Sequence, residues 1–494
     1  MRKVAFLLAL LLAGCATAPA YRPPAVEVPP VFREQAASRA NAARSPDSLP
    51  AAPPTVPAAV PVLPGDSSSD ELWRALGDTT LERLVGELAR ANLDIRAAEA
   101  RVRGARSART QSALDLAPTV TFGGGYTRQR LSSAAFPIGA ARFPDQDIWD
   151  AGFDAAWELD LFGRLRHNLQ AQGAFVAASR EDLRDIRVTL TAELARSYFE
   201  LRGAQERLAV ARRNAANQRS TFQVTRERLD AGRGTAFDTE RAQAQLSFTL
   251  ASIPALEAGV AEAQYRIGVL VGRPPAAVAA ELETAAALPP LPAATAVVAA
   301  DSVIRRRPDV SAAERQLAVE RALVGAAKAD YLPRLSVGGS AGYSATAFGG
   351  LGDRGTFRYA VGPVVTWPAL NLGRVKAGVD ASRAREAEAQ ARYDQTVLLA
   401  LQEVETSLSQ YRTARARVDQ IGNAASASAR AAELARLRFT GGVADFLQVL
   451  DAERTQLDAE DQLAQARTDA ATAYAALYKA LGGESPSALD QGRR

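Results

Sequence analysis

Few residues in this chain of 494 could carry out chemistry. It has one cysteine, Cys15, and one histidine, His167, so neither a disulfide nor a His/Cys metal cluster can form within it. The run GGG at 123–125 lies within a strand pattern, and no Gly-Lys-Ser/Thr follows it, so it does not predict a phosphate loop. No nucleophile and base stand out as a pair. We therefore expect no enzyme, no catalytic residue, no metal and no cofactor, and we interpret His167 as an interface side chain.

Cys15 stands where a lipid could be attached. Arg2 and Lys3 precede an unbroken apolar run at 4–13, which is typical of a secretory signal and too short to span a membrane as a helix. The sequence LAGC at 12–15 resembles the lipobox of bacterial lipoproteins, in which the cysteine thiol takes a diacylglyceryl group and becomes residue one. Ala16 replaces the aspartate of inner-membrane retention, which by resemblance indicates the outer membrane. The alternative is an ordinary signal peptide that happens to contain a cysteine.

Composition favours long helices and excludes some partners. The formal net charge is only +4 and aromatic residues make up 6%, so the chain has no basic footprint and we expect no nucleic acid. Alanine, arginine, glutamate, glutamine and leucine dominate long stretches, which favours long helices. After Cys15 no apolar run approaches 18 residues. If the mature chain enters a membrane, we expect it to do so as strands.

The chain contains an internal duplication. LDIRAAEARV (93–102) returns as PDVSAAERQL (308–317), and WELDLFGR (157–164) returns as WPALNLGR (367–374). RLDAGRGTAFDTERAQAQL (228–246) returns as RFTGGVADFLQVLDAERTQL (438–457). Three matches in the same order indicate a tandem repeat rather than helical low complexity. We expect a signal peptide at 1–14, a Pro/Ala-rich lipid-anchored arm at 15–75, repeats at 76–275 and 301–482, an equatorial linker at 276–300 and a tail at 483–494.

Each repeat contains two predicted strands, about 118–128 and 148–158 in the first and about 333–343 and 356–367 in the second. Apolar residues alternate with small or polar ones along each strand. In the second strand, Phe153 is thereby placed on one face and the acids Asp150, Asp154 and Glu158 on the other. This alternation is typical of outer-membrane barrel strands and speaks against the edge of a soluble sandwich. The three acids either bias a pore toward cations or are simply solvated. Pro363 interrupts the last strand and predicts a bend or bulge.

Aromatic residues lie near the ends of these strands. We expect Tyr126, Trp149 and Tyr343 near one membrane interface, and Trp157 and Trp367 near the other. Four strands cannot close a transmembrane barrel, because open edges do not survive in lipid. The chain must therefore share its barrel with copies of itself, two giving 8 strands and three giving 12.

Two long proline-free stretches, 165–230 and 374–440, predict helices of roughly 100 Å at 1.5 Å per residue. Apolar residues in the second stretch follow a heptad seam: Val397, Leu401, Val404, Leu408, Tyr411 and Val418. Both helices are expected to end at glycines, which are Gly232 and Gly234 in the first repeat and Gly441 and Gly442 in the second. Shorter helices then return, so each repeat is predicted to form a helical hairpin.

Taken together, the repeats, the LAGC motif, RRRPDVSAAERQL (305–317) and FLQVLDAERTQL (446–457) resemble the TolC-like outer-membrane efflux proteins, in particular their lipoprotein branch. The resemblance implies a mixed α and β, tandem-duplicated protomer of a homotrimer. Each protomer would contribute four strands to a shared 12-strand transmembrane β-barrel and long helices to a periplasmic 12-helix α-barrel. The implied partners are a periplasmic adaptor protein, a proton-driven inner-membrane pump and outer-membrane lipid, and the duct would perform no chemistry on its solute.

The resemblance also implies a gate at the periplasmic tip. By the match to FLQVLDAER, Leu447, Asp451 and Arg454 form the constriction, and their spacing places them on one helix face. The alternative is that Asp451 and Arg454 form an ordinary i,i+3 surface pair. Two departures weaken the match: Gln448 replaces a second acidic ring, and Phe439 replaces a tyrosine that ties helices together. In the first repeat, Phe237 and Arg241 occupy the equivalent positions without the acid.

The sequence therefore predicts the passive exit duct of a tripartite drug-efflux system. One alternative is the duct of a type I protein secretion system. Another is a lipid-anchored periplasmic coiled-coil scaffold that never enters the membrane, which would leave the apolar strand faces without a purpose.

Overall fold

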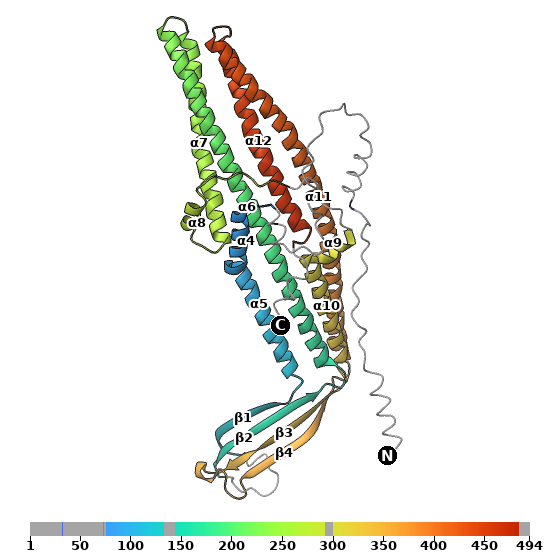
Figure 1. Ribbon diagram of the computed structural model, residues 1–494. Coiled ribbons are helices and arrows are strands. Elements are labelled where there is room, and N and C mark those ends of the chain that lie inside the picture. The colour runs from blue at the N-terminus through green and yellow to red at the C-terminus, as the bar shows by residue number, and fades with distance from the viewer. Residues whose placement is uncertain (1–31, 33–72, 74–75, 133–143, 292–299, 484–494) are drawn as a thin grey trace. The chain divides into compact units, whose positions relative to one another are not determined.

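The computed structural model describes Phe32, Trp73 and residues 76–132, 144–291 and 300–483 (Figure 1). Cys15, the expected signal peptide, the rest of the expected arm up to residue 75, and 484–494 of the tail lie outside the described residues. No described helix is both long and apolar enough to cross a membrane. The chain forms two compact units, and both draw on both sequence repeats. Unit 1 contains 101–180 and 312–394, whereas unit 2 contains 26–100, 181–311 and 395–494.

Unit 1 contains a four-stranded antiparallel sheet in the order β1-β2-β3-β4 (Figure 1). The strands are β1 (Thr119–Gln129), β2 (Gln146–Leu159), β3 (Arg334–Ala345) and β4 (Phe357–Thr366). The central pairing of β2 with β3 joins the two repeats, from Trp149↔Ala345 to Leu159↔Leu335. The bulge expected at Pro363 is absent, because the β3–β4 register runs unbroken through Val337↔Pro363. Pro363 lies in the edge strand β4, where a proline is tolerated.

The two faces of the sheet differ sharply in side-chain character. One face carries large apolar side chains that are exposed, including Phe122 at 68%, Phe153 at 57% and Val361 at 74%. The opposite face carries glycine, serine, threonine and a few charged residues. On that face Gly152 and Gly342 pair directly, and a Cβ added to Gly342 would lie 2.6 Å from the Gly152 Cα. The two strands therefore approach closely only because neither position has a side chain.

The helical part of unit 1 packs through small residues. It includes residues from 101 of α5 (Leu93–Leu114), from 312 of α10 (Pro308–Ala329), and the first turns of α6 (Arg164–Asp230) and α11 (Leu372–Thr440). Ala171 of α6 is buried with Val319 and Ala322 of α10. The His167 ring lies against Gly325, where an added Cβ would be 2.9 Å from its Nδ1. His167 thus packs against α10 within this unit. The interface role predicted from the sequence stays a prediction. A short 3₁₀ turn, η2 (Phe348–Gly350), lies between β3 and β4.

Unit 2 is helical and contains two long hairpins. The helix α6, of 67 residues, returns as α7 (Ala236–Leu270), and α11, of 69 residues, returns as α12 (Phe446–Ala480) (Figure 1). Three shorter helices accompany them: α4 (Thr79–Ala91), α8 (Pro275–Glu281) and α9 (Ala300–Arg306). The predicted heptad seam of α11 is buried at Val397, Val404, Leu408 and Tyr411 and half-buried at Leu401 and Val418.

The core of unit 2 also contains two aromatic residues from the N-terminal region. Phe32 and Trp73 are fully buried in the same cluster as Leu194, Tyr198 and Leu201 of α6. The Trp73 ring centroid lies 4.8 Å from that of Tyr478 and 6.4 Å from that of Tyr474, both on α12. Large aromatic side chains bury much apolar area, so these two residues tie the N-terminal region to the helices.

In each repeat, a side chain donates a hydrogen bond to the last carbonyl of the returning helix, and the donor residue differs between the repeats. In the first repeat, Asn92 Nδ2 donates to the Leu270 carbonyl at the end of α7 over 2.7 Å. In the second, Arg307 Nη1 donates to the Ala480 carbonyl at the end of α12 over 2.8 Å. Arg307 is nearly buried, and it also binds Asp309 and Glu403 at 2.7 and 2.6 Å. Arg307 of the RPD sequence in the second repeat thus satisfies a free carbonyl at the end of α12 and stabilises that helix end through ion pairs.

Candidate functional site: the hairpin tips and the sheet

Both hairpins turn through the same backbone conformation. Gly232 and Gly442 adopt φ values of 67° and 77°, which only glycine adopts easily. In each turn the backbone N–H of the residue after this glycine donates to a carbonyl in the last turn of the helix. Arg233 donates to the Arg228 carbonyl, and Val443 donates to the Arg438 carbonyl. The other two predicted turn glycines, Gly234 and Gly441, lie in these turns without a positive φ. One glycine in each turn is therefore required by its backbone conformation.

The predicted gate residues lie on the exposed face of α12. Leu447 is 49% exposed, and Gln448, Asp451 and Arg454 are also exposed, whereas Phe446, Val449 and Glu453 are buried on the other face. Within the described part of the chain, neither Asp451 nor Arg454 has an ion-pair partner within 4.0 Å. Asp451 and Arg454 therefore form no i,i+3 ion pair in this conformation, and both side chains project into solvent. Their place at a gate stays a prediction.

An aromatic cluster holds the two tips together. The Phe439 ring at the end of α11 lies 5.7 Å from the Phe446 ring at the start of α12. Arg228 of α6 places its guanidinium 4.3 Å from the centre of the Phe439 ring and donates to the Phe439 carbonyl over 2.9 Å. Phe439 thus joins the hairpins by ring packing and a cation–π contact, since it has no hydroxyl. In the first repeat, Arg241 lies over Phe237 at 5.2 Å.

A buried carboxylate lies directly behind the gate residues. Glu453 is 4% exposed, accepts from Arg436 Nε of α11 over 2.9 Å, and accepts from Thr221 Oγ1 of α6 over 2.9 Å. It therefore joins both hairpins. Because residues two apart on a helix point to opposite sides, burying Glu453 turns Asp451 outward. Glu453 orients the helix face that carries the predicted gate residues.

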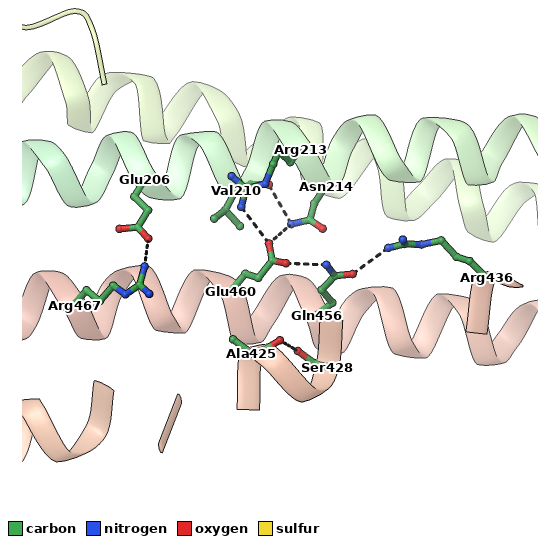
Figure 2. A network of polar contacts seen from close by, with 10 residues as sticks. All are labelled: Glu206, Val210, Arg213, Asn214, Ala425, Ser428, Arg436, Gln456, Glu460 and Arg467. Carbon is green, nitrogen blue, oxygen red and sulfur yellow. Dashed lines mark hydrogen bonds and ion pairs between the residues drawn. The ribbon is translucent and has the colours of Figure 1, made fainter. Parts of the chain in front are cut away.

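Glu453 begins a polar seam between α6 and α12. Figure 2 shows the part of the seam that follows it along α12. Seven residues further along α12, Glu460 accepts from Asn214 over 3.3 Å, and seven beyond that Arg467 donates to Glu206 over 2.7 Å. Gln456 bridges Glu460 and Arg436, at 2.7 and 3.0 Å. Further along α12 the contacts become apolar, with Ala471 and Tyr474 in the main core. Along α12 the aromatic cluster at the tip is thus followed by the polar seam and then by the main apolar core.

Sequence reasoning missed Glu453, Arg436 and Arg228. Glu453 follows Phe446 by seven residues and Val449 by four, so it lies on the apolar face of its helix. This position could have identified Glu453 from the sequence, because a charged side chain on a buried helix face needs a partner. Its partners could not be found without knowing which helices pack together.

The five predicted girdle aromatics lie toward the ends of the sheet. At one end Tyr126 pairs directly with Trp149, with ring centroids 4.5 Å apart, and Tyr343 pairs with Phe357. At the other end Trp157 Nε1 donates to the Leu116 carbonyl over 2.9 Å, and Trp367 Nε1 makes the equivalent bond to Tyr331 over 3.0 Å. The two tryptophans occupy matching positions in the repeats. Their indole N–H groups are satisfied while their rings remain partly exposed.

An antiparallel sheet with an exposed apolar face and two long helical hairpins in one duplicated chain form the architecture of an outer-membrane channel protein. The family model for outer membrane efflux proteins matches at residues 84–273 and again at 299–483. The chain belongs to the outer membrane efflux protein family. The resemblance predicted from its sequence is thereby confirmed.

Individual relatives match the chain over nearly its whole length. Outer membrane protein OprJ of Pseudomonas aeruginosa is 32% identical over 514 residues, covering 100% of this chain and 98% of that protein. Nodulation protein T of Rhizobium leguminosarum bv. trifolii is 26% identical over 481 residues, with 96% and 95% covered. The solved outer-membrane channel OprN superposes with a TM-score of 0.82 at 35% identity, covering 95% of this chain and 99% of that one. The fold class predicted from the sequence is confirmed by these channel neighbours.

Proposed function

We propose that this protein is the passive exit duct of a tripartite efflux system, working as a homotrimer anchored in the outer membrane through a lipid on Cys15. Three copies would pair their four-stranded sheets into a 12-strand barrel and their hairpins into a 12-helix tunnel in the periplasm. A periplasmic adaptor and a proton-driven inner-membrane pump would dock on it and supply the energy. The duct itself would perform no chemistry on drugs or other small solutes.

The observation that carries this proposal is the two-faced sheet. Its large exposed apolar side chains would face lipid, and its small and polar side chains would face water. The outer edges of β1 and β4 have no partner strand in the described chain. Because unpaired backbone groups are not tolerated in lipid, the sheet needs strands from other copies to enter a membrane. A periplasmic scaffold would not need this arrangement.

Two valines of β4 provide a matched test. Val361 lies on the apolar face and is 74% exposed, and Val364 lies on the small and polar face and is 54% exposed. Val361→Arg should reduce assembled trimer in outer-membrane fractions, because a lipid-facing arginine at mid-membrane costs about 2–4 kcal/mol. Val364→Arg should assemble normally and change only conduction. Equal assembly of the two variants would contradict the membrane assignment.

The gate belongs to the same proposal. Three copies of Leu447, Asp451 and Arg454 would form apolar and charged rings that narrow the periplasmic entrance. The double variant Leu447→Ala with Asp451→Ala should increase the passive leak of large antibiotics through the duct. The control is the equivalent pair in the first repeat, Phe237→Ala with Arg241→Ala, which should not leak. An unchanged leak in the first variant would remove these residues from the gate.

A further inference from the structure

The small and polar face of the sheet carries five charged side chains, identified by the alternation of the unbroken register. Four of them are neutralised by a partner. Asp150 pairs with Arg358 at 3.4 Å, Glu158 pairs with Arg164 at 2.7 Å, and Arg334 pairs with Asp330 at 2.7 Å. These contacts leave one carboxylate on this face, that of Asp154.

Asp154 is exposed, and among the residues that the structure describes it has no cationic nitrogen within 4.0 Å. Its neighbours on this face are all small. Thr121 and Ser340 stand opposite it on the adjacent strands, and Gly152 and Ala156 flank it on its own strand. The long side chain of Arg358 lines the same hollow, but its guanidinium is paired with Asp150.

Glycines beside Asp154 leave a hollow in this face of the sheet. A Cβ added to Gly123 would lie 4.0 Å from Asp154 Oδ2, so the carboxylate leans over a position with no side chain. A hollow of about 200 Å³ includes the Asp154 carboxylate and is lined by Gly123, Gly152 and Ser340, and also by Asp150 and Arg358. Because Asp150 and Arg358 balance each other, Asp154 gives this hollow its net negative charge. A hydrated cation can therefore approach this oxygen directly. Paired charges such as Asp150 and Arg358 act as a dipole, whose electric field falls faster with distance than the field of a single charge.

We propose that Asp154 is the charge that makes the strand half of the duct select cationic over anionic solutes. The inference rests on the proposed trimeric duct, in which three copies would place three unpaired carboxylates in one ring around the lumen. Such a ring concentrates cations and repels anions within about one Debye length, which is roughly 10 Å at 0.1 M salt. Asp150 and Glu158 lie on the same strand and face but do not take part, because their partners cancel them.

The test uses the full lipidated protein in a planar bilayer, with reversal potentials measured in KCl gradients. Asp154→Asn should lower the ratio of potassium to chloride permeability by at least about twofold at ~0.01 M salt, where the Debye length is about 30 Å. The difference should vanish near 1 M salt, where that length is about 3 Å. The matched control is Asp150→Asn with Arg358→Gln, which removes a charge pair and leaves the net charge unchanged. It should keep the wild-type ratio at every salt concentration.

Three results would overturn the assignment of Asp154. One is a wild-type permeability ratio in Asp154→Asn, and another is an equal shift in the paired control. A shift that persists at high salt would also do so, because it would indicate altered structure rather than charge. Failure of the wild-type protein to conduct at all would instead contradict the duct itself. Channel conductance at 1 M salt serves as the folding control, since a folded Asp154→Asn duct should match the wild type there.

Discussion

Gly203 of α6 offers a direct test of how α6 and α12 pack. A Cβ added at this position would lie 2.9 Å from the Thr468 Cβ and 2.8 Å from its Cγ2. Rotation of the Thr468 side chain cannot relieve this clash, because the Cβ itself does not move with χ1. Gly203→Ala must therefore push the two helices apart or bend one of them.

The expected magnitude combines two opposing effects. Replacing glycine by alanine within a helix stabilises it by about 1 kcal/mol. Overpacking a close interface costs about 1–3 kcal/mol, and a clash between two Cβ atoms belongs at the upper end of that range. We therefore expect Gly203→Ala to destabilise the protein by about 2 kcal/mol net. The control is Gly259→Ala in α7, where an added Cβ meets nothing within 4 Å and only the gain in helix propensity should remain.

The assay is the melting temperature in detergent at one fixed scan rate, since large membrane proteins unfold irreversibly. Gly203→Ala should melt below the wild type and Gly259→Ala slightly above it. Adding Thr468→Gly to Gly203→Ala should restore most of the loss, because it removes the Cβ that clashes, and substitutions at two residues in contact are not additive. The packing deduced here would be refuted if Gly203→Ala melted at or above the wild-type temperature. It would also be refuted if the double variant were no better than the single one.

Two further predictions concern buried polar groups. Glu453→Gln should loosen the hairpin tips by about 1–3 kcal/mol, because it removes the ion pair with Arg436 while an amide can still accept from Thr221. Proteolysis at the hairpin turns should then speed up, and an unchanged cleavage rate would argue against this role. Burial, together with a hydrogen bond donated to Asp78 over 2.6 Å, raises the pKa of Tyr198 to about 12 from 10.0. The neutral phenol therefore stabilises the fold below pH 10, and that contribution is lost as the pH rises through about 12. Tyr198→Phe should flatten the fall of melting temperature across that range, and an identical slope would contradict the shift.

Much of the architecture could be predicted from local pattern. Apolar residues at every second position predicted four strands, whose ends lie within three residues of the observed ends. Glycines predicted the hairpin turns. The heptad of α11 identified side chains that are buried in the structure, such as Val397 and Val404. These patterns are strong because one face of each element is apolar along its whole length.

Pairing between distant segments could not be predicted in this way. Asp150, Asp154 and Glu158 have the same spacing and the same chemistry in the sequence, yet Asp154 is the one of the three without a cationic partner among the described residues. Arg358, which neutralises Asp150, comes from the other repeat, and Arg164 reaches Glu158 only after a turn. The partners of Glu453 are likewise fixed by which helices pack together. Charge pattern along a sequence therefore does not predict which charges remain free.

The interleaving of the repeats has an evolutionary consequence. Each compact unit takes one part from each copy, and β2 of the first copy pairs with β3 of the second. A single copy would leave a two-stranded hairpin, which is marginally stable at best alone in water. An ancestor with one copy would thus have needed two chains to complete either unit, and a ring equivalent to three present chains would have needed six. Two copies in one chain remove that requirement, and the halves can then differ, as Asn92 and Arg307 do at equivalent helix ends.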